Sequence, residues 1–168
     1  MTFGQRLVGV LMLDAPTYEE IEADRNATGQ AMTVVVAGSI AAGVGAGLAR
    51  GAVGLVHETL GSLVGWVMWA GATYVIGARL LPSPQTRTDM GELLRVIGFA
   101  FAPIGFAFLH VVPVAPVLHW LIRLVVELWL LATMVIAVRQ ALDYDSTGRA
   151  VVVVLAGLFL FELIQGLT

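Results

Sequence analysis

The sequence predicts an all-α integral membrane protein with five transmembrane helices. A short amphipathic interfacial helix should precede them, with the N-terminus inside and the C-terminus outside. Three observations lead to this prediction: the composition, five long apolar runs and the placement of the arginines. Of the 168 residues, 58% are hydrophobic and 12% charged, where a soluble domain carries about 25% charged residues. The mean hydropathy of +0.89 also places the chain among membrane proteins.

Composition also limits the possible partners and location. A formal net charge of −3, without any basic patch, argues against a nucleic-acid partner. The chain has no cysteine, which excludes disulfides, thiolate nucleophiles and sulfur-ligated metals. All basic residues are arginine, and with the Ala, Gly and Val bias this indicates high-GC bacterial coding. We therefore expect the bacterial cytoplasmic (inner) membrane.

Residues 1–30 are predicted to form a cytoplasmic amphipathic segment. Phe3, Leu7 and Leu11 share one helical face, as in a short helix lying in the membrane interface. A break is expected around Pro16. Thr17, followed by Glu20, is expected to cap a second helix as a capping box, and that acidic helix should be exposed.

Residues 31–168 are predicted to form the transmembrane domain. Each of five apolar runs is close to the roughly 20 residues that a helix needs to cross about 30 Å of hydrocarbon. Almost none of them has a polar face to show to water. The predicted spans are 31–49, 60–78, 94–113, 117–138 and 150–167.

The arginines predict the orientation. Cytoplasmic loops of membrane proteins carry an excess of positive charge. With the N-terminus inside, only Arg50 lies on the outer side and Arg123 lies within a span. The inner side then holds Arg6, Arg25, Arg79, Arg87, Arg95, Arg139 and Arg149.

Two short motifs, in this order and with this topology, suggest a family. Asp14-x-Pro16-Thr17-Tyr18 precedes the first span, and Arg95-x-x-Gly98-Phe99-Ala100-x-x-Pro103 lies on the third. Over essentially its whole length the chain resembles the YIP (Ypt-interacting protein) domain family. The resemblance implies five spans and a cytosolic N-terminus.

The resemblance also bears on partners. Eukaryotic members of the family sit in Golgi and ER membranes, form complexes with one another and contact Rab-type GTPases. They carry an Asp-Leu-Tyr-Gly-Pro-Leu-Trp segment before the first span, where this chain has Asp24-Arg25-Asn26-Ala27-Thr28. This departure argues against a GTPase partner and indicates a minimal bacterial member.

Three charged residues within the predicted spans form the main candidate site. Arg123 and Glu127 are four residues apart, so they share a helix face and can pair. Glu162, on the fifth span, falls at a similar depth. Because charges at mid-bilayer are costly, they should face inward and meet. We expect a buried Arg123–Glu127–Glu162 cluster, serving either as an interhelical link or as part of an ion or proton path.

The third span carries two further features. Glu92 and Arg95 are three residues apart at its cytoplasmic end and are expected to pair as an interfacial anchor, with Arg95 also able to reach headgroups. Pro103 lies mid-span. It should bend the helix and free a carbonyl near residue 99 that a neighbour must satisfy.

No cofactor, metal site or enzyme activity is predicted. His57, Glu58, His110 and His119 all fall on the predicted outer side and are the weak candidates for a zinc-type site. No HExxH spacing is present, and no Ser/His/Asp set or phosphate-binding loop is found.

The sequence therefore predicts a non-enzymatic scaffold that organises membranes or binds partners. Its expected partners are membrane lipids, and further copies or other chains held through the helix faces. The alternative is a small transporter or channel component that uses the Glu/Arg cluster.

Overall fold

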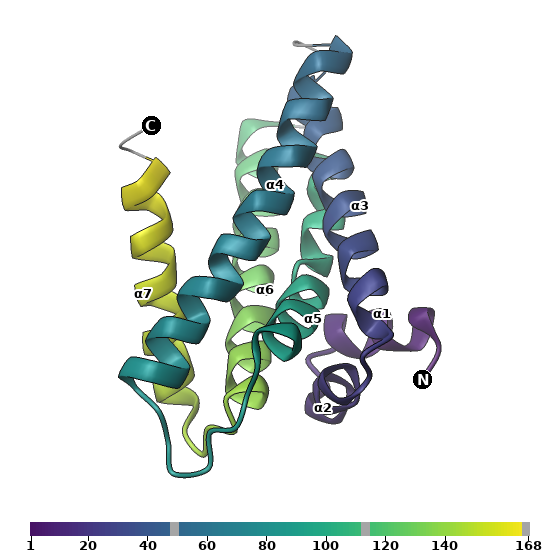
Figure 1. Ribbon diagram of the computed structural model, residues 1–168. Helices are drawn as coiled ribbons and strands as arrows, with labels where there is room; N and C mark the ends of the chain where they lie inside the picture. The colour runs from purple at the N-terminus through teal and green to yellow at the C-terminus, as the bar shows by residue number, and fades with distance from the viewer. Residues whose placement is uncertain (48–50, 112–114, 166–168) are drawn as a thin grey trace.

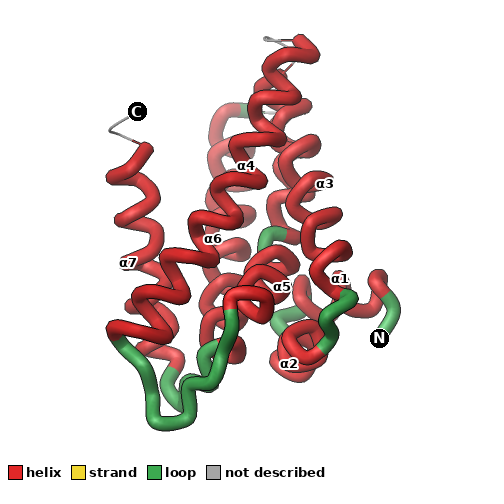
Figure 2. Tube along the Cα trace, in the orientation of Figure 1, coloured by secondary structure: helices red, strands yellow, loops and turns green. Residues whose placement is uncertain are grey.

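The computed structural model describes residues 1–47, 51–111 and 115–165. Within these ranges every regular element is a helix, which confirms the predicted all-α class (Figure 2). The elements, in chain order, are α1 (Phe3–Leu11), α2 (Ala15–Ala23), α3 (Ala27–Gly47), α4 (Gly51–Thr73), the π-helix η1 (Tyr74–Leu80), α5 (Met90–Ala100), the 3₁₀ helix η2 (Ala102–Val111), α6 (Pro116–Ala141) and α7 (Thr147–Gln165).

The long helices form one bundle. In Figure 1, α4 crosses the front obliquely, α3 and α7 lie on opposite sides, and α5 and α6 lie behind. The short helices α1 and α2 pack on the bundle, where α2 contacts α5 and α6, and α1 contacts α5 and η2. The N-terminal segment is therefore held against the span helices.

Three helical stretches of the described chain are long and apolar enough to cross a membrane: Gly51–Leu80, Met90–Leu109 and Pro116–Ala141. Two further apolar helices, Ala27–Gly43 and Thr147–Leu160, are shorter over their described residues. All five lie within or overlap the predicted spans. The membrane-like architecture is confirmed, and the count of five and the orientation stay predictions.

One hydrophobic core joins the N-terminal segment to the bundle. Val10, Tyr18 and Ile21 are fully buried in the same cluster as Ala31 and Phe99. Residues 1–30 therefore pack against the helices of residues 31–168.

The third span changes its helix type at the predicted proline. Pro103 has no backbone N–H, so an α-helix cannot continue regularly through it. The chain tightens into η2, where the Ile104 amide donates to the Phe101 carbonyl at 2.9 Å. The carbonyl of Ala100 instead accepts the hydroxyl of Thr133 on α6 at 2.8 Å. A neighbour does satisfy the freed carbonyl, as expected.

The predicted cap of the second helix is wrong. The helix begins at Ala15 with Asp14 as the N-cap residue and Pro16 in the first turn, where proline is favoured. Thr17 lies inside the helix, and its hydroxyl donates to Asp14 Oδ2 at 2.6 Å.

The expected exposure of this helix is also wrong, because Tyr18 and Ile21 are buried in the core. The helix crosses α1 at Gly9, where a Cβ would collide with the side chain of Thr17. Tertiary packing of the apolar positions decided its placement, although its composition is acidic.

Candidate functional site

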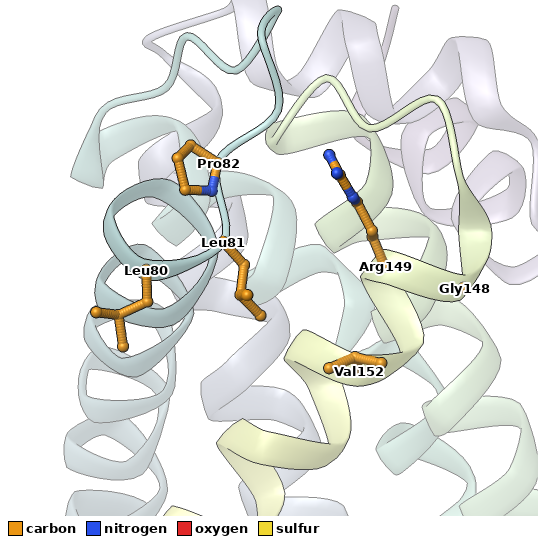
Figure 3. Close-up of a pocket in the computed structure, with 6 residues that line it drawn as sticks. All are labelled: Leu80, Leu81, Pro82, Gly148, Arg149 and Val152. Carbon is orange, nitrogen blue, oxygen red and sulfur yellow. The ribbon is translucent and has the colours of Figure 1, made fainter.

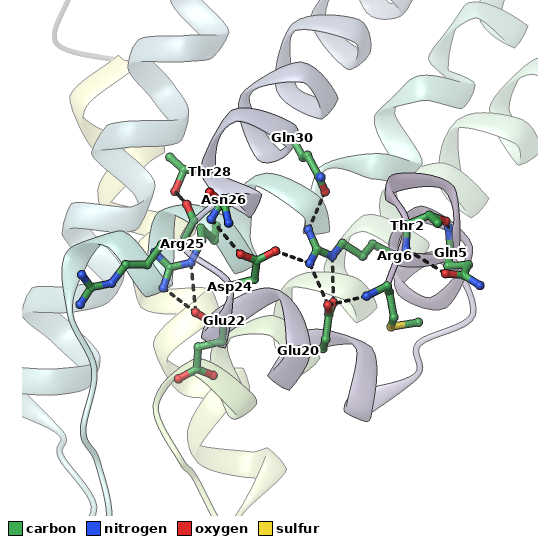
Figure 4. A network of polar contacts seen from close by, with 12 residues as sticks. Thr2, Gln5, Arg6, Glu20, Glu22, Asp24, Arg25, Asn26, Thr28 and Gln30 are labelled. Carbon is green, nitrogen blue, oxygen red and sulfur yellow. Dashed lines mark hydrogen bonds and ion pairs between the residues drawn. The ribbon is translucent and has the colours of Figure 1, made fainter.

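A buried arginine holds the N-terminal helices together. Arg6 on α1 binds Glu20 on α2 twice: Nε donates to Oε2 and Nη2 to Oε1, each at 2.8 Å. Nη2 also donates to Asp24, just after α2, and Nη1 donates to Gln30 Oε1 on α3 at 2.7 Å. We call Arg6, Glu20, Asp24 and Gln30 the Arg6 cluster (Figure 4).

The charges of the Arg6 cluster compensate one another. The Arg6 side chain is only 3% exposed, and the N-terminal amine adds a second cation 2.8 Å from Glu20 Oε1. The hydrogen bond from Arg6 is the main cause that lowers the pKa of Glu20 to about 2. A separate hydrogen bond from Arg6 lowers the pKa of Asp24, and the hydrogen bond to Glu20 raises the pKa of Arg6. Both carboxylates are therefore ionised at neutral pH.

Sequence reasoning missed this cluster, because it considered Arg6 only as one of the positive charges on the cytoplasmic side. A signal was present: Glu20 and Asp24 are four residues apart and so share one face of the second helix. An arginine on the preceding short helix was available to both.

A second arginine joins α2 to the third span. Arg95 on α5 is buried and donates from Nε to the carbonyl of Glu22 at 3.1 Å, and from Nη2 to the same oxygen. That carbonyl lies in the last turn of α2, where backbone oxygens lack intrahelical donors and cations are favoured.

The predicted Glu92–Arg95 pair does not form. Glu92 instead accepts the backbone N–H of Asp89 at 2.8 Å, while Asp89 Oδ1 accepts that of Glu92 at 2.8 Å. This reciprocal arrangement caps the start of α5, and it leaves Arg95 free to bind α2.

The side chain of Glu22, whose carbonyl binds Arg95, lies near other acidic residues. Burial, followed by the charges of Glu92 and Asp143, raises the pKa of its carboxyl to about 7, against the opposite effect of Arg95. The group therefore changes charge near neutral pH.

Two more contacts hold α1 and α2 on the bundle, and a third joins the two short helices to each other. The Trp129 indole on α6 donates to the Leu11 carbonyl at 2.9 Å. The Tyr18 hydroxyl donates to the Val10 carbonyl at 3.2 Å. Gln140, also on α6, donates to Glu19 Oε1 at 3.0 Å.

The motif residues of the predicted family gather where the N-terminal segment meets the third span. A Cβ on Gly98 would lie 2.7 Å from that of Ala31 on α3 and 3.1 Å from the Trp66 ring. The Phe99 ring lies 6.0 Å from that of Phe3. Asp14 occupies the N-cap position of α2 and accepts the Thr17 hydroxyl, Arg95 binds α2, and buried Pro103 follows the α-helical part of the span. Helix packing and contacts with α2 therefore explain the residue types at these positions.

The charged pair on α6 forms, but outside the bundle. Arg123 Nε donates to Glu127 Oε1 at 2.7 Å, and the two side chains are 66% and 56% exposed. The expectation that they are buried within the chain is wrong, because α5, η2 and α7 cover other faces of α6. Glu162 lies on α7, and its side chain is outside the described residues, so its part in a cluster stays a prediction.

A pocket lies where η1 ends and α7 begins. Leu80, Leu81, Pro82, Gly148, Arg149 and Val152 line a cavity of about 420 Å³ (Figure 3). The side chains that line it are apolar apart from the Arg149 guanidinium, which extends away from Val152 (Figure 3). Such a lining suits a molecule with an acidic group beside a hydrocarbon chain.

The structure describes the side chains of only two of the four weak metal candidates. His57 on α4 is exposed, and His119 lies on α6. Glu58 and His110 fall outside the described side chains. Among the described residues no group of three potential ligands gathers.

The comparisons with known proteins give one match. The model of the Yip1 domain family matches residues 8–166 of the chain. No curated protein and no solved structure matches the chain.

Proposed function

Because the chain belongs to the Yip1 domain family, we propose that it is a non-enzymatic scaffold of the bacterial cytoplasmic membrane that holds partner proteins or lipids. The family is not a known enzyme family, and the apolar helices fit a multi-pass membrane protein. Both findings support the proposal.

The observation that carries the proposal is the docked N-terminal segment. Its arginine and carboxylates are engaged with one another in the Arg6 cluster, and hence are not directed at a substrate. The exposed face of α1 and its C-cap is apolar, with Val8 55% and Met12 76% exposed. A rigid short helix with an apolar face is suited to the membrane interface and to contact with a partner there.

We place the N-terminus in the cytoplasm, together with the loop that joins η1 to α5 and the loop that joins α6 to α7. This puts Arg149 and its pocket at the inner interface, where a guanidinium beside apolar walls can bind an anionic lipid headgroup. No GTPase partnership is proposed.

A small transporter or channel component is the alternative. A conducting path needs polar groups that line an interior route. The exposed position of Arg123 and Glu127 on α6 does not supply one, so the scaffold is favoured.

Flux measurements would separate the two functions. We expect vesicles that contain the purified chain to pass protons and small ions no faster than protein-free vesicles. Flux above that level, abolished by Glu127→Gln, would contradict the scaffold and support transport.

Partner capture tests the scaffold directly. After extraction from native membranes with surrounding lipid, the wild-type chain should bring down a defined set of proteins or lipids. Met12→Glu, on the exposed face of the N-terminal segment, should lose part of this set. Leu155→Ala, at an exposed position on α7, serves as the control. Identical sets from all three chains would argue against the N-terminal face as the binding surface.

A further inference from the structure

Two cavities share the same pair of walls, with α4 and η1 on one side and α7 on the other. The cavity beside Arg149 lies at the start of α7. A second cavity, of about 260 Å³, lies farther along the same helices and is lined in part by Trp69, Val75, Gly157 and Leu160. Both α4 and η1 contact α7, which Figure 1 shows beside the lower part of α4. We call the two cavities together the α4–α7 groove.

The second cavity is suited to a hydrocarbon chain. The side chains that line it are uncharged, and Val75 and Leu160 at its edge are exposed. In a chain embedded in a membrane, this edge faces lipid. Gly157 leaves part of the space empty, because a Cβ there would meet only the Trp69 ring, at 4.0 Å.

The first cavity supplies a positive charge. Its one ionisable group is Arg149, whose side chain is exposed. Within the described residues, no hydrogen bond or ion pair engages this guanidinium. Gly148 lines the same cavity in the first turn of α7, the end of a helix that favours an anion. Arginine binds phosphate through several N–H donors at once, so a phosphate group fits this end of the groove.

The length of the groove matches one leaflet of a bilayer. Arg149 and Leu160 are eleven residues apart, which is about three turns, so they lie on nearly the same face of α7 and about 16 Å apart along its axis. Half of the roughly 30 Å hydrocarbon core is about 15 Å, which is the depth that an acyl chain reaches below its headgroup.

We propose that the α4–α7 groove binds one phospholipid with an anionic headgroup. Its phosphate contacts Arg149, and one acyl chain follows α7 into the cavity beside Trp69 and Gly157. The assignment to the cytoplasmic leaflet rests on the orientation given under the proposed function; the contacts themselves do not. A zwitterionic lipid binds less well, because its own ammonium group compensates the phosphate and is repelled by Arg149.

Counting bound lipids by native mass spectrometry of the intact chain, released from detergent micelles, tests the site. We expect the wild-type chain to retain one dioleoyl phosphatidylglycerol, and to bind dioleoyl phosphatidylcholine about tenfold more weakly, since one charge-assisted contact is at stake. Glycerol phosphate, which has the headgroup charge without acyl chains, should not be retained. Equal retention of the two lipids would indicate unselective lipid around the helices. Retention of glycerol phosphate as strong as that of the whole lipid would indicate a site for soluble phosphates. Either result overturns the proposal.

Substitution of Arg149 tests the charged end of the groove. Arg149→Gln should lower the retention of phosphatidylglycerol to that of phosphatidylcholine. Arg149→Lys should keep a preference for the anionic lipid, because an ammonium also binds phosphate. Arg87→Gln, at an exposed arginine in the loop between η1 and α5, is the matched control and should bind like the wild type. Equal losses in Arg149→Gln and Arg87→Gln would show that net charge alone attracts the lipid, and would overturn the site.

Substitution of Gly157 tests the apolar end. Gly157→Leu places a side chain in the second cavity and should weaken the retention of dioleoyl phosphatidylglycerol several-fold. Gly61→Leu is the control, because Gly61 on α4 has no atom within 4 Å of an added Cβ. Unchanged retention in Gly157→Leu would overturn the placement of the acyl chain.

These measurements are independent of the partner capture described above, because they use the isolated chain in detergent. Loss of the lipid preference, with capture through Met12 intact, would overturn the groove and leave the scaffold standing. A lipid preference that depends on Arg149 and Gly157, in a chain that captures no protein, would support the groove and restrict the scaffold to lipids.

Discussion

At the scale of single residues, the ionisation of Glu22 opposes folding. Burial and the neighbouring charges of Glu92 and Asp143 raise the pKa of its carboxyl to about 7, above the ordinary value near 4.3. The folded chain thus binds more protons than the unfolded chain between these values. This carboxyl makes the free energy of unfolding fall as the pH rises from about 4.5 to about 7.

Glu22→Gln should remove this pH-dependent loss. We expect the variant to unfold at the wild-type temperature at pH 4, and a few degrees higher than the wild type at pH 8. Thermal unfolding in lipid nanodiscs at both pH values measures the difference. Asp145→Asn, at an exposed position, is the control and should give the wild-type profile. A variant that gains nothing at pH 8 would contradict the assigned burial of the carboxyl.

Arg6 is the residue on which the N-terminal contacts converge. Arg6→Met keeps most of the side-chain volume but leaves Glu20 without its main donor. We expect a loss of about 1–3 kcal/mol in the free energy of unfolding, the usual cost when one partner of a buried hydrogen-bonded group is removed. Limited proteolysis should also release residues 1–30 faster. Arg25→Gln, at an exposed arginine, should change neither quantity, and equal effects of the two variants would rule out the special role of Arg6.

At the scale of elements, the third span depends on a close approach at Gly98. A methyl group there would meet Ala31 and Trp66 within 3.1 Å, and overpacking of this kind costs about 1–3 kcal/mol. Gly98→Ala should lower the thermal unfolding temperature in nanodiscs. Gly105→Ala, on η2 with no atom within 4 Å of its added Cβ, is the matched control. Equal stability of the two variants would mean that α3 and α5 are not this close.

The same elements show how far sequence reasoning reaches. The break at Pro103 was predictable because it follows from the missing N–H of one residue, and so was the need for a neighbouring donor. The identity of that donor, Thr133, was not predictable, because it depends on how α6 lies against α5. Likewise, local capping rules suggested Thr17 as a helix start, while the burial of Tyr18 and Ile21 placed it inside the helix.

At the scale of the whole molecule, apolar composition predicted the class and the approximate helix positions. It did not predict the use of the charged residues. Arg6 and Arg95 were assigned to surfaces, yet both are buried and bind α2. Arg123 was assigned to the interior, yet it is exposed. A single sequence gives depth along a helix, but the face that meets its neighbours depends on contacts between distant segments.

The orientation of the molecule is the last prediction, and it follows from charge. Seven arginines fall on one predicted side and Arg50 alone on the other, and arginine-rich loops stay in the cytoplasm. A reporter that is active only in the cytoplasm should therefore work when fused after Pro84 or after Thr147, the positions that follow η1 and begin α7. Fused to the C-terminus, it should be silent, because an odd number of spans separates the two ends. Replacing Arg79 and Arg87 by Gln weakens the bias and should leave a fraction of chains inverted. Activity at the C-terminus as well as at both loop positions would require a different number of spans, with α7 too short to cross the membrane. Silence at the two loop positions with activity at the C-terminus would reverse the orientation.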